Sequence, residues 1–288
     1  FIEPTVGVRK LVVPNIHPFS LIKNIVKESV SSSNSPHYLF YEDSDGFHFK
    51  TVQELYKQPA VGIFHYSENL PKTNKEKEQV VVDLTKIIKY ELQGTNDMLM
   101  NTMSGMLGST SISHDVYSKN YVKKTYDYFK EFDNNTRVSN SSNPKYSEST
   151  DLNGKTLGNY PDSRTYVHPI STKGTIDANH MKHTPSKLKD YHSEYHSRTV
   201  ELNTGIVLTL QIPGNTALRV GNVIELDIPV IGVDHNDERV DRFLSGNFLI
   251  KSLRHQFMES TRTHMIYMAA VKDSVESSIP TAESLALY

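Results

Sequence analysis

The sequence contains no cysteine and no tryptophan, and each absence excludes or disfavours a class of function. Without cysteine the chain has no disulfide framework, no thiolate nucleophile and no cysteine-bound zinc site. Without tryptophan it lacks the exposed indole rings expected of a glycan-binding module. An excess of one charge is also missing, because 31 basic and 33 acidic residues leave a net charge of -2. This balance disfavours a nucleic-acid partner.

Long apolar runs are absent as well. No window reaches about 18 consecutive apolar residues, and no basic-then-apolar start marks a signal peptide, so we expect no transmembrane helix and no membrane partner. Hydrophobic residues make up 37% of the 288 residues. This low share predicts either long polar loops or surface that is buried on assembly. The chain starts at Phe1 without a methionine, so we expect it to be part of a longer protein.

Residues 1–132 have the pattern of a mixed α/β domain. A helix is predicted from Pro18, because apolar residues recur on one helical face after it. Residues 38–42 and 47–50 are aromatic, alternating runs joined by a turn that ends in Asp45-Gly46, which predicts a β-hairpin. Residues 61–66 and 108–132 are further strand candidates.

The composition changes at residue 133. Residues 133–187 are rich in Asn, Ser, Thr, Pro, Gly and Lys, so we expect a long polar arm that lies over a neighbouring subunit. Residues 187–203 begin as a polar helix and are expected to become a strand. Regular strands separated by turns follow, which predicts a small antiparallel barrel or sandwich over residues 188–275, with a tail at 276–288. The predicted fold class is therefore mainly β with some helix, or α+β.

Motifs with a known catalytic mechanism are missing from the sequence. It contains no glycine-rich nucleotide-binding loop, no zinc-protease motif and no serine-hydrolase motif. We therefore predict that the protein is not an enzyme and has no cofactor.

Four histidines provide the alternative, a metal-dependent enzyme. His192 and His196 are four residues apart and would share one helical face, from which two imidazoles can bind one metal ion. His180 and His183 are close enough in sequence to add ligands. The competing interpretation is a solvated helix face, and the two are separated by geometry.

A cluster of methionines between Met98 and Met106 has two interpretations. Methionine fills gaps in a core, and it also forms adaptable surfaces for partners. Of the two, gap-filling in a core is the favoured interpretation of this cluster.

Val12-Val13-Pro14-Asn15 precede the Pro18 helix, the aromatic hairpin follows, and residues 105–132 continue the pattern. This order of segments resembles the baseplate hub proteins of contractile-tailed (T-even-like) bacteriophages. The C-terminal pattern from Pro213 to Leu226, and from Ser245 to His255, is similar to the tube-forming barrel shared by phage hubs and VgrG-like secretion spikes.

The resemblance implies a structural virion component of the tail baseplate. Three copies would form a ring that connects the tail tube to the central spike, with the spike protein, the tube protein and other baseplate proteins as partners. It implies that residues 188–275 form a tube domain. The positions expected in the core or at the subunit interface are Leu218, Val220, Val223, Ile224, Leu226, Phe248, Ile250 and Leu253. Arg254 and His255 either face a neighbour or the lumen, or lie on a solvated strand face.

Overall fold

The computed structural model describes residues 1–7, 12–66, 84–94, 97–116, 119–143, 162–170, 188–230, 240–241 and 243–274. The chain forms two compact units, each built from separate segments. Unit 1 comprises residues 1–54, 97–136 and 148–201, and unit 2 comprises residues 55–96, 137–147 and 202–288. Both units cross the predicted boundaries after residues 132 and 187. Within the described ranges, no helix has the length and apolar character needed to cross a membrane.

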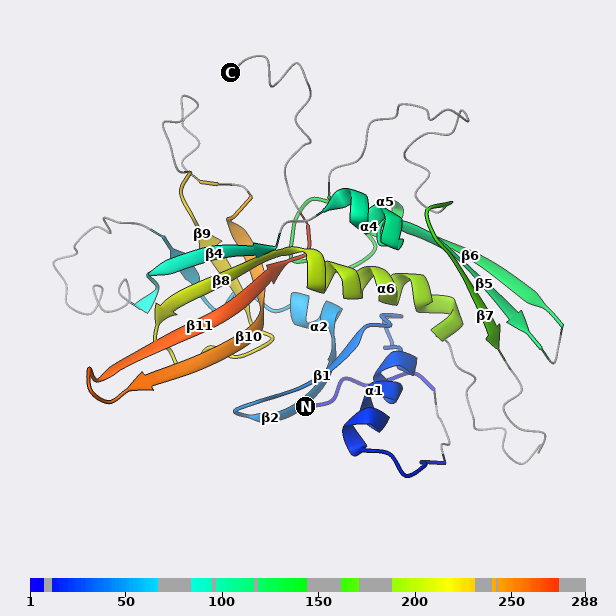
Figure 1. Cartoon of the computed structure of the whole chain (residues 1–288), viewed down its shortest axis with the longest axis horizontal. Coiled ribbons are helices and arrows are strands. Elements are labelled where there is room, and N and C mark those ends of the chain that lie inside the picture. The colour runs from blue at the N-terminus through cyan, green and yellow to red at the C-terminus, as the bar shows by residue number, and fades with distance from the viewer. Residues whose placement is uncertain are drawn as a thin grey trace, which may run out of the picture. The chain divides into compact units, whose positions relative to one another are not determined.

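Strands predominate over helices, as predicted (Figure 1). The elements of unit 1 are α1 (Pro18–Glu28), β1 (Tyr38–Asp43), β2 (Gly46–Thr51), α4 (Met98–Ser104), β5 (Gly108–Asp115), β6 (Tyr121–Asp127), α5 (Tyr128–Glu131) and β7 (Thr165–Ile170). Those of unit 2 are β3 (Ile63–His65), β4 (Lys89–Gly94), β8 (Ile206–Pro213), β9 (Val223–Asp227), β10 (Gly246–Met258) and β11 (Thr263–Lys272). Two helices contribute residues to both units, α2 (Val52–Tyr56) and α6 (Leu188–Thr204).

The N-terminal helix and hairpin form where their local sequence predicts them. In α1, Pro18 occupies the first turn, and the His17 ring accepts a hydrogen bond of 3.3 Å from the backbone N–H of Phe19, which caps the helix. β1 and β2 pair antiparallel along their whole length. Gly46 has a φ of +127° at the end of the turn, a conformation that favours glycine. Both predictions are confirmed.

The three-stranded sheet of unit 1 includes part of the predicted arm. Its order is β6-β5-β7, with β6 antiparallel and β7 parallel to β5. The prediction of an arm over residues 133–187 is therefore wrong for β7. Backbone hydrogen bonds to β5 hold this strand in place. Because these bonds join main-chain groups, a strand can pair within a segment whose overall composition is polar. Residues 144–161 and 171–187 of the predicted arm lie outside the described residues.

Another part of the predicted arm packs within unit 2. Val138 and Ser139 are buried, and their backbone N–H groups donate to the carboxylate of Asp273 at 3.2 and 3.0 Å. Asp273 is itself buried. A buried carboxylate is stabilised by such N–H donors, so this contact orders a segment that has few apolar side chains.

α6 is helical throughout, so the predicted change to a strand before Asn203 is wrong. The fully buried residues of the helix are polar: Ser193, Ser197, Arg198 and Glu201. Their spacing of four, one and three residues places them on one helical face. Arg198 and Glu201 form a buried ion pair with an N–O distance of 3.4 Å. The sequence does not reveal the full length of the helix, because its inward face carries small and paired charged residues instead of an apolar stripe.

His37 packs against this polar face of α6. Its ring meets the edge of Tyr195 at a centroid distance of 5.0 Å, and its Nε2 atom lies 3.4 Å from the Thr199 hydroxyl. Burial and the neighbouring Arg198 guanidinium lower the pKa of His37 to about 3. His37 is therefore neutral at pH 7, which avoids placing a second positive charge beside Arg198.

Unit 2 is a six-stranded sheet that curls toward a barrel (Figure 1). The strand order is β3-β9-β10-β11-β8-β4, and every pair is antiparallel except β3 and β9. Strands β8 to β11 lie in the range where the barrel was predicted. β3 and β4 come from the segment that we assigned to the N-terminal domain, so the sheet is assembled from two distant parts of the chain.

One short segment joins the two edges of the sheet. The backbone N–H of His65 in β3 donates to Thr85 at 3.0 Å, and the N–H of Ile87 donates back to the His65 carbonyl at 2.9 Å. The next N–H, that of Ile88, donates to Gln211 in β8 at 2.9 Å. Residues 85–88 therefore extend β4 and bridge β3 to β8, which closes the sheet at this end.

β8 supplies the centre of the core by strict alternation. Its buried residues are Ile206, Leu208, Leu210 and Ile212, each 0% exposed. Burying a side chain of this size contributes ~1.5–3 kcal/mol. Phe64 from β3 and Ile87 from the closing segment join the same cluster. Ile87 therefore contributes both to the apolar core and to the joining of the sheet edges.

The first prediction concerns this closure. Replacing Ile87, which is 0% exposed, with alanine leaves a cavity where the edges meet and should lower the free energy of unfolding by about 2–4 kcal/mol. The matched control is Ile88→Ala, because Ile88 is 43% exposed and should cost less than about 1 kcal/mol. Urea denaturation followed by circular dichroism measures both. If both variants lost the same free energy of unfolding, the proposed role of Ile87 in joining the sheet edges would be wrong.

The second prediction concerns pH. The folded pKa of His37 is about 3, below the ordinary 6.5, so the unfolded chain binds more protons between these values. The contribution of His37 to stability is thus complete above pH 6.5 and is lost as the pH falls, by about 3 kcal/mol at pH 4. The His37→Gln variant should show an unfolding free energy that falls less between pH 7 and pH 4, by this amount. His114→Gln, at an exposed position, is the control, and an unchanged pH dependence in His37→Gln would refute the assignment.

Candidate assembly surfaces

The eight residues predicted at core or interface positions all lie in unit 2 and divide into two groups. Six are buried, namely Leu218, Val223, Ile224, Leu226, Phe248 and Ile250. Val220 and Leu253 are half-buried, and Leu253 packs against the core cluster. Of the eight, only Val220 and Leu253 therefore retain surface that a neighbouring subunit can contact.

The outer edge of β10 is a second candidate surface. β10 pairs with β9 only from Gly246 to Leu249, and Ile250 bonds to the backbone of Gly221 and Asn222 at 2.9 Å. Beyond Ile250, none of the described strands pairs with this edge, although β11 covers the other edge as far as Met258. Figure 1 shows the β10–β11 hairpin projecting past the end of β8. Such an unpaired edge is a template for a strand from another chain.

The projecting part of the hairpin is ordered by a ring cluster. His255 Nδ1 lies 3.0 Å from His264 Nε2, and Phe257, which is 70% exposed, stacks on His264 at a centroid distance of 4.1 Å. Gly214 lies directly beneath this ring, because a Cβ added there would meet His264 Nδ1 at 2.0 Å. Arg254 and His255 are both exposed on this strand. The hairpin therefore presents an aromatic side chain to solvent in a defined position.

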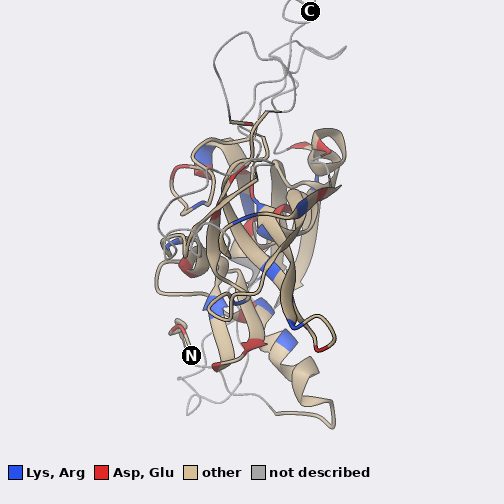
Figure 2. Ribbon diagram, turned by 90° about the vertical axis from the view of Figure 1, so that its left-hand side faces the viewer, with Lys and Arg blue, Asp and Glu red and all other residues tan. Residues whose placement is uncertain are grey.

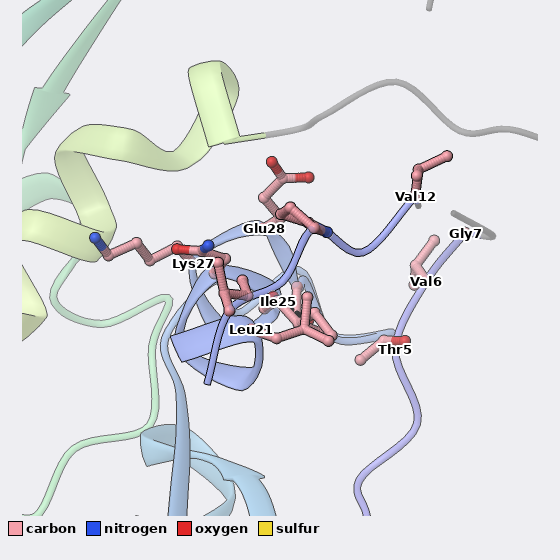
Figure 3. Close-up of a pocket in the computed structure, with 12 residues that line it drawn as sticks. Thr5, Val6, Gly7, Val12, Leu21, Ile25, Lys27 and Glu28 are labelled. Carbon is pink, nitrogen blue, oxygen red and sulfur yellow. Dashed lines mark hydrogen bonds between the residues drawn. The ribbon is translucent and has the colours of Figure 1, made fainter. Parts of the chain in front are cut away.

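α1 in unit 1 borders an apolar groove. None of its residues is buried, although its apolar residues lie on one face. A cavity of about 580 Å³ runs beside it. Its lining combines apolar side chains of α1 and of residues 5–7 and 12–16 with polar ones that include Lys27 and Glu28. Figure 3 shows Leu21 and Ile25 projecting from α1 toward Thr5 and Val6, whereas Lys27 extends away. We call this cavity the α1 groove.

A second cavity lies between α1 and the β1–β2 hairpin. Its volume is about 510 Å³, and Ile25 lines both cavities. Its wall is aromatic, with Phe40 and Phe47 stacked at a centroid distance of 5.7 Å. The large apolar side chains left exposed in this part of unit 1 are Phe1, Ile2, Val6, Val12, Val13, Ile16, Phe19, Ile25 and Phe47. Monomeric proteins rarely expose so many together, which marks an interaction surface.

α4 carries the methionines singled out in the sequence. Leu99, Met100 and Met103 are 64%, 60% and 59% exposed, whereas Met106, just after the helix, is buried. The core interpretation is therefore wrong for α4. Its single fully buried residue is Asn101, so the polar side chain points inward and the apolar side chains point outward. We call these three exposed residues the α4 knob.

His192 and His196 share one face of α6, and each ring contacts other groups of unit 1. His196 Nε2 lies 2.9 Å from the Ser104 carbonyl oxygen, and the His192 ring packs against His168 and Tyr166 at centroid distances of 4.4 and 4.8 Å. Burial, followed by the nearby His168 and His196, lowers the pKa of His192 to about 4. Sequence spacing did not reveal His168, because β7 brings it from a distant segment.

Over the ranges that the structure describes, no three His, Asp or Glu side chains are placed to hold one metal ion. His180 and His183, the other members of the predicted cluster, lie outside the described residues. Basic and acidic side chains are interspersed along the described chain (Figure 2). Apolar surfaces, more than charge or ligand clusters, therefore distinguish this molecule.

Comparison with known proteins finds similarity among solved structures. No family model matches the sequence, and no curated protein matches it. Among solved structures, the chain is similar to the crystal structure of the tail protein from Neisseria meningitidis MC58, with 10% sequence identity and a TM-score of 0.38. The similarity covers 84% of this chain and 52% of that protein, so the chain spans about half the length of the tail protein that it resembles.

Proposed function

We propose that this chain is a structural subunit of a phage tail baseplate hub. In this proposal, three copies form a ring between the tail tube and the central spike, and the protein is not an enzyme. Its partners are other copies of itself, the spike protein, the tube protein and neighbouring baseplate proteins. The site of action is the virion tail baseplate, and no membrane or specific nucleic-acid partner is involved.

The observation that carries the proposal is the open edge of β10. The sheet of unit 2 is joined at its other end by residues 85–88, yet residues 251–258 present an edge that no described strand pairs. Exposed edges of this length are normally covered, twisted away or paired. A copy of the chain placed at this edge would complete the hydrogen bonding, and three copies in a ring would leave no subunit with an open edge.

The exposed apolar side chains support the same proposal. The hairpin presents Phe257, and unit 1 presents the α1 groove and the α4 knob. Stable protein–protein interfaces bury about 800 Å² on each partner, with aromatic residues and methionine enriched at the centre. The low apolar fraction of the whole chain agrees with a subunit that completes its apolar packing with neighbours.

The third prediction tests the ring. Light scattering over a dilution series should give the mass of a trimer, because three copies satisfy the open edges. Phe257→Glu introduces a charge at the exposed edge and should weaken association at least tenfold. Ser260→Glu adds the same charge in the adjacent turn and should leave the trimer intact.

Two results would count against the hub. One is a wild-type chain that stays monomeric at every concentration. The other is a trimer that Phe257→Glu leaves unchanged while thermal unfolding shows that this variant is folded, because the β10 edge would then not be at the interface.

A further inference from the structure

Two histidines of the projecting hairpin face each other across β10 and β11. His255 Nδ1 lies 3.0 Å from His264 Nε2, a distance at which one ring donates a hydrogen bond to the other. The contact therefore needs one of the two facing nitrogens to carry no proton. We propose that this His255–His264 pair supports association along the β10 edge while its hydrogen bond is intact, and weakens association when both rings are protonated. This regulation rests on the proposed ring.

The pair lies where the core-facing side of the sheet reaches the projecting hairpin. His255 is directly opposite Ile266, which is 0% exposed, and cross-strand partners share one face of a sheet. Leu253, two residues before His255, packs against the core cluster. His255 also falls within residues 251–258, where none of the described strands pairs with the outer edge of β10. The pair is therefore beside the edge that the proposed ring would cover.

The two rings are held to different degrees. His264 lies against the backbone of Gly214, whose N–H donates to the His264 carbonyl oxygen at 2.8 Å. Phe257 stacks on the His264 ring at a centroid distance of 4.1 Å. His255, by contrast, is exposed, and its ring centroid lies 5.2 Å from that of His264. His264 is therefore fixed, and His255 is the ring that turns toward solvent when the contact breaks.

Proton uptake acts on this contact in two steps. In the neutral pair, one facing nitrogen donates a hydrogen bond and the other accepts it. A first added proton makes one ring an imidazolium that still donates to its neutral neighbour, so the contact persists. A second added proton leaves two donors and no acceptor between two positive charges, and the contact breaks. The pair therefore responds to the second proton.

His264 is the charged neighbour that acts most directly on His255. Burial on the side of its neighbours, followed by the charge of His264, lowers the pKa of His255 below the ordinary 6.5. Arg254 and its cross-strand partner Tyr267 lie on the other face of the hairpin, and residues 213–215 contain no titratable side chain. The hairpin turn adds one acid and one base, Glu259 and Arg262. The surrounding charges therefore do not favour a second proton on the pair.

Association and protonation are coupled at this position. A strand that pairs with the β10 edge lies about 4.8 Å from it, so the pair would lose contact with water on that side. Burying a charged ring without an acidic partner is unfavourable, whereas a neutral, hydrogen-bonded pair can be buried. Copies with a neutral pair therefore associate more strongly, and by linkage a fall in pH dissociates the ring.

The fourth prediction compares the wild-type chain with His255→Gln, which stays neutral at every pH and leaves the Phe257–His264 stack in place. Between pH 8 and pH 5, the wild-type trimer should weaken about tenfold in light scattering over a dilution series, because the pair becomes doubly charged. His255→Gln should remain trimeric and change less than about twofold. This range lies above the pKa values of His37 and His192, about 3 and about 4, so those rings stay largely neutral.

A second measurement examines the pair independently of assembly. Isotope labelling of the histidine rings followed by NMR gives a titration curve for each histidine. In His264→Gln the pKa of His255 should rise toward 6.5, because the neighbouring charge is gone. The matched control is His114→Gln, at an exposed position of β5, which should alter neither the titration of His255 nor the pH dependence of the trimer. Thermal unfolding verifies that each variant is folded.

The contrary outcomes are distinct from one another. If the wild-type trimer is equally stable over this pH range, or if His255→Gln keeps the wild-type pH dependence, this regulation is wrong and the hub proposal stands. The regulation is also wrong if His255 titrates identically in the wild type and in His264→Gln, because the two rings then do not interact. If the wild-type chain is monomeric at both pH values, the hub proposal fails and the regulation fails with it.

Discussion

The architecture of unit 2 depends on the hydrogen bonds that residues 85–88 make to two strands at once. The consecutive N–H groups of Ile87 and Ile88 reach β3 through His65 and β8 through Gln211. Without them, β3 and β4 would be two free edges of an open sheet, and the core residue Ile87 would be exposed. These four residues therefore pair backbone N–H groups with carbonyl oxygens and also place the Ile87 side chain in the core. Closure of a sheet is the most complete way to protect its edges.

Residues 85–88 join the edges of the sheet at one end, whereas the outer edge of β10 beyond Ile250 is paired by none of the described strands. The hairpin runs on past β8 and β9, and a ring cluster of His255, Phe257 and His264 orders it without burying it. Unit 1 shows the same property in another form, because α4 turns Leu99, Met100 and Met103 outward and α1 has no buried residue. Ordered but unburied apolar surface is characteristic of a subunit, since its burial is completed only in the assembly.

Much of the local structure could be predicted from the residues. The helix after Pro18, the aromatic hairpin that turns at Gly46, and the alternating β8 all follow from patterns that span fewer than about fifteen residues. Prediction failed at α6 and at β7 for definite reasons. α6 buries serines and the Arg198–Glu201 pair, so its inward face has no apolar stripe. β7 contains the β-formers Thr165, Tyr166 and Val167, but it lies within a segment of polar composition, and its pairing with the distant β5 is not encoded locally.

For the candidate surfaces, too, the sequence revealed which residues stand out but not what surrounds them. Spacing placed His192 and His196 on one helical face, and composition identified the methionine cluster, but neither observation revealed the surroundings. Only the tertiary structure places His168 beside His192, turns Met100 and Met103 outward, and leaves the β10 edge unpaired.

The sequence by itself determined the mainly β character, the local hairpin and helix, and the absence of cysteine chemistry, because these depend on residue identity and short-range periodicity. The tertiary structure decided which distant strands pair and which apolar faces stay exposed. Pairing and exposure depend on contacts between residues that are far apart in the chain, and no local pattern encodes them.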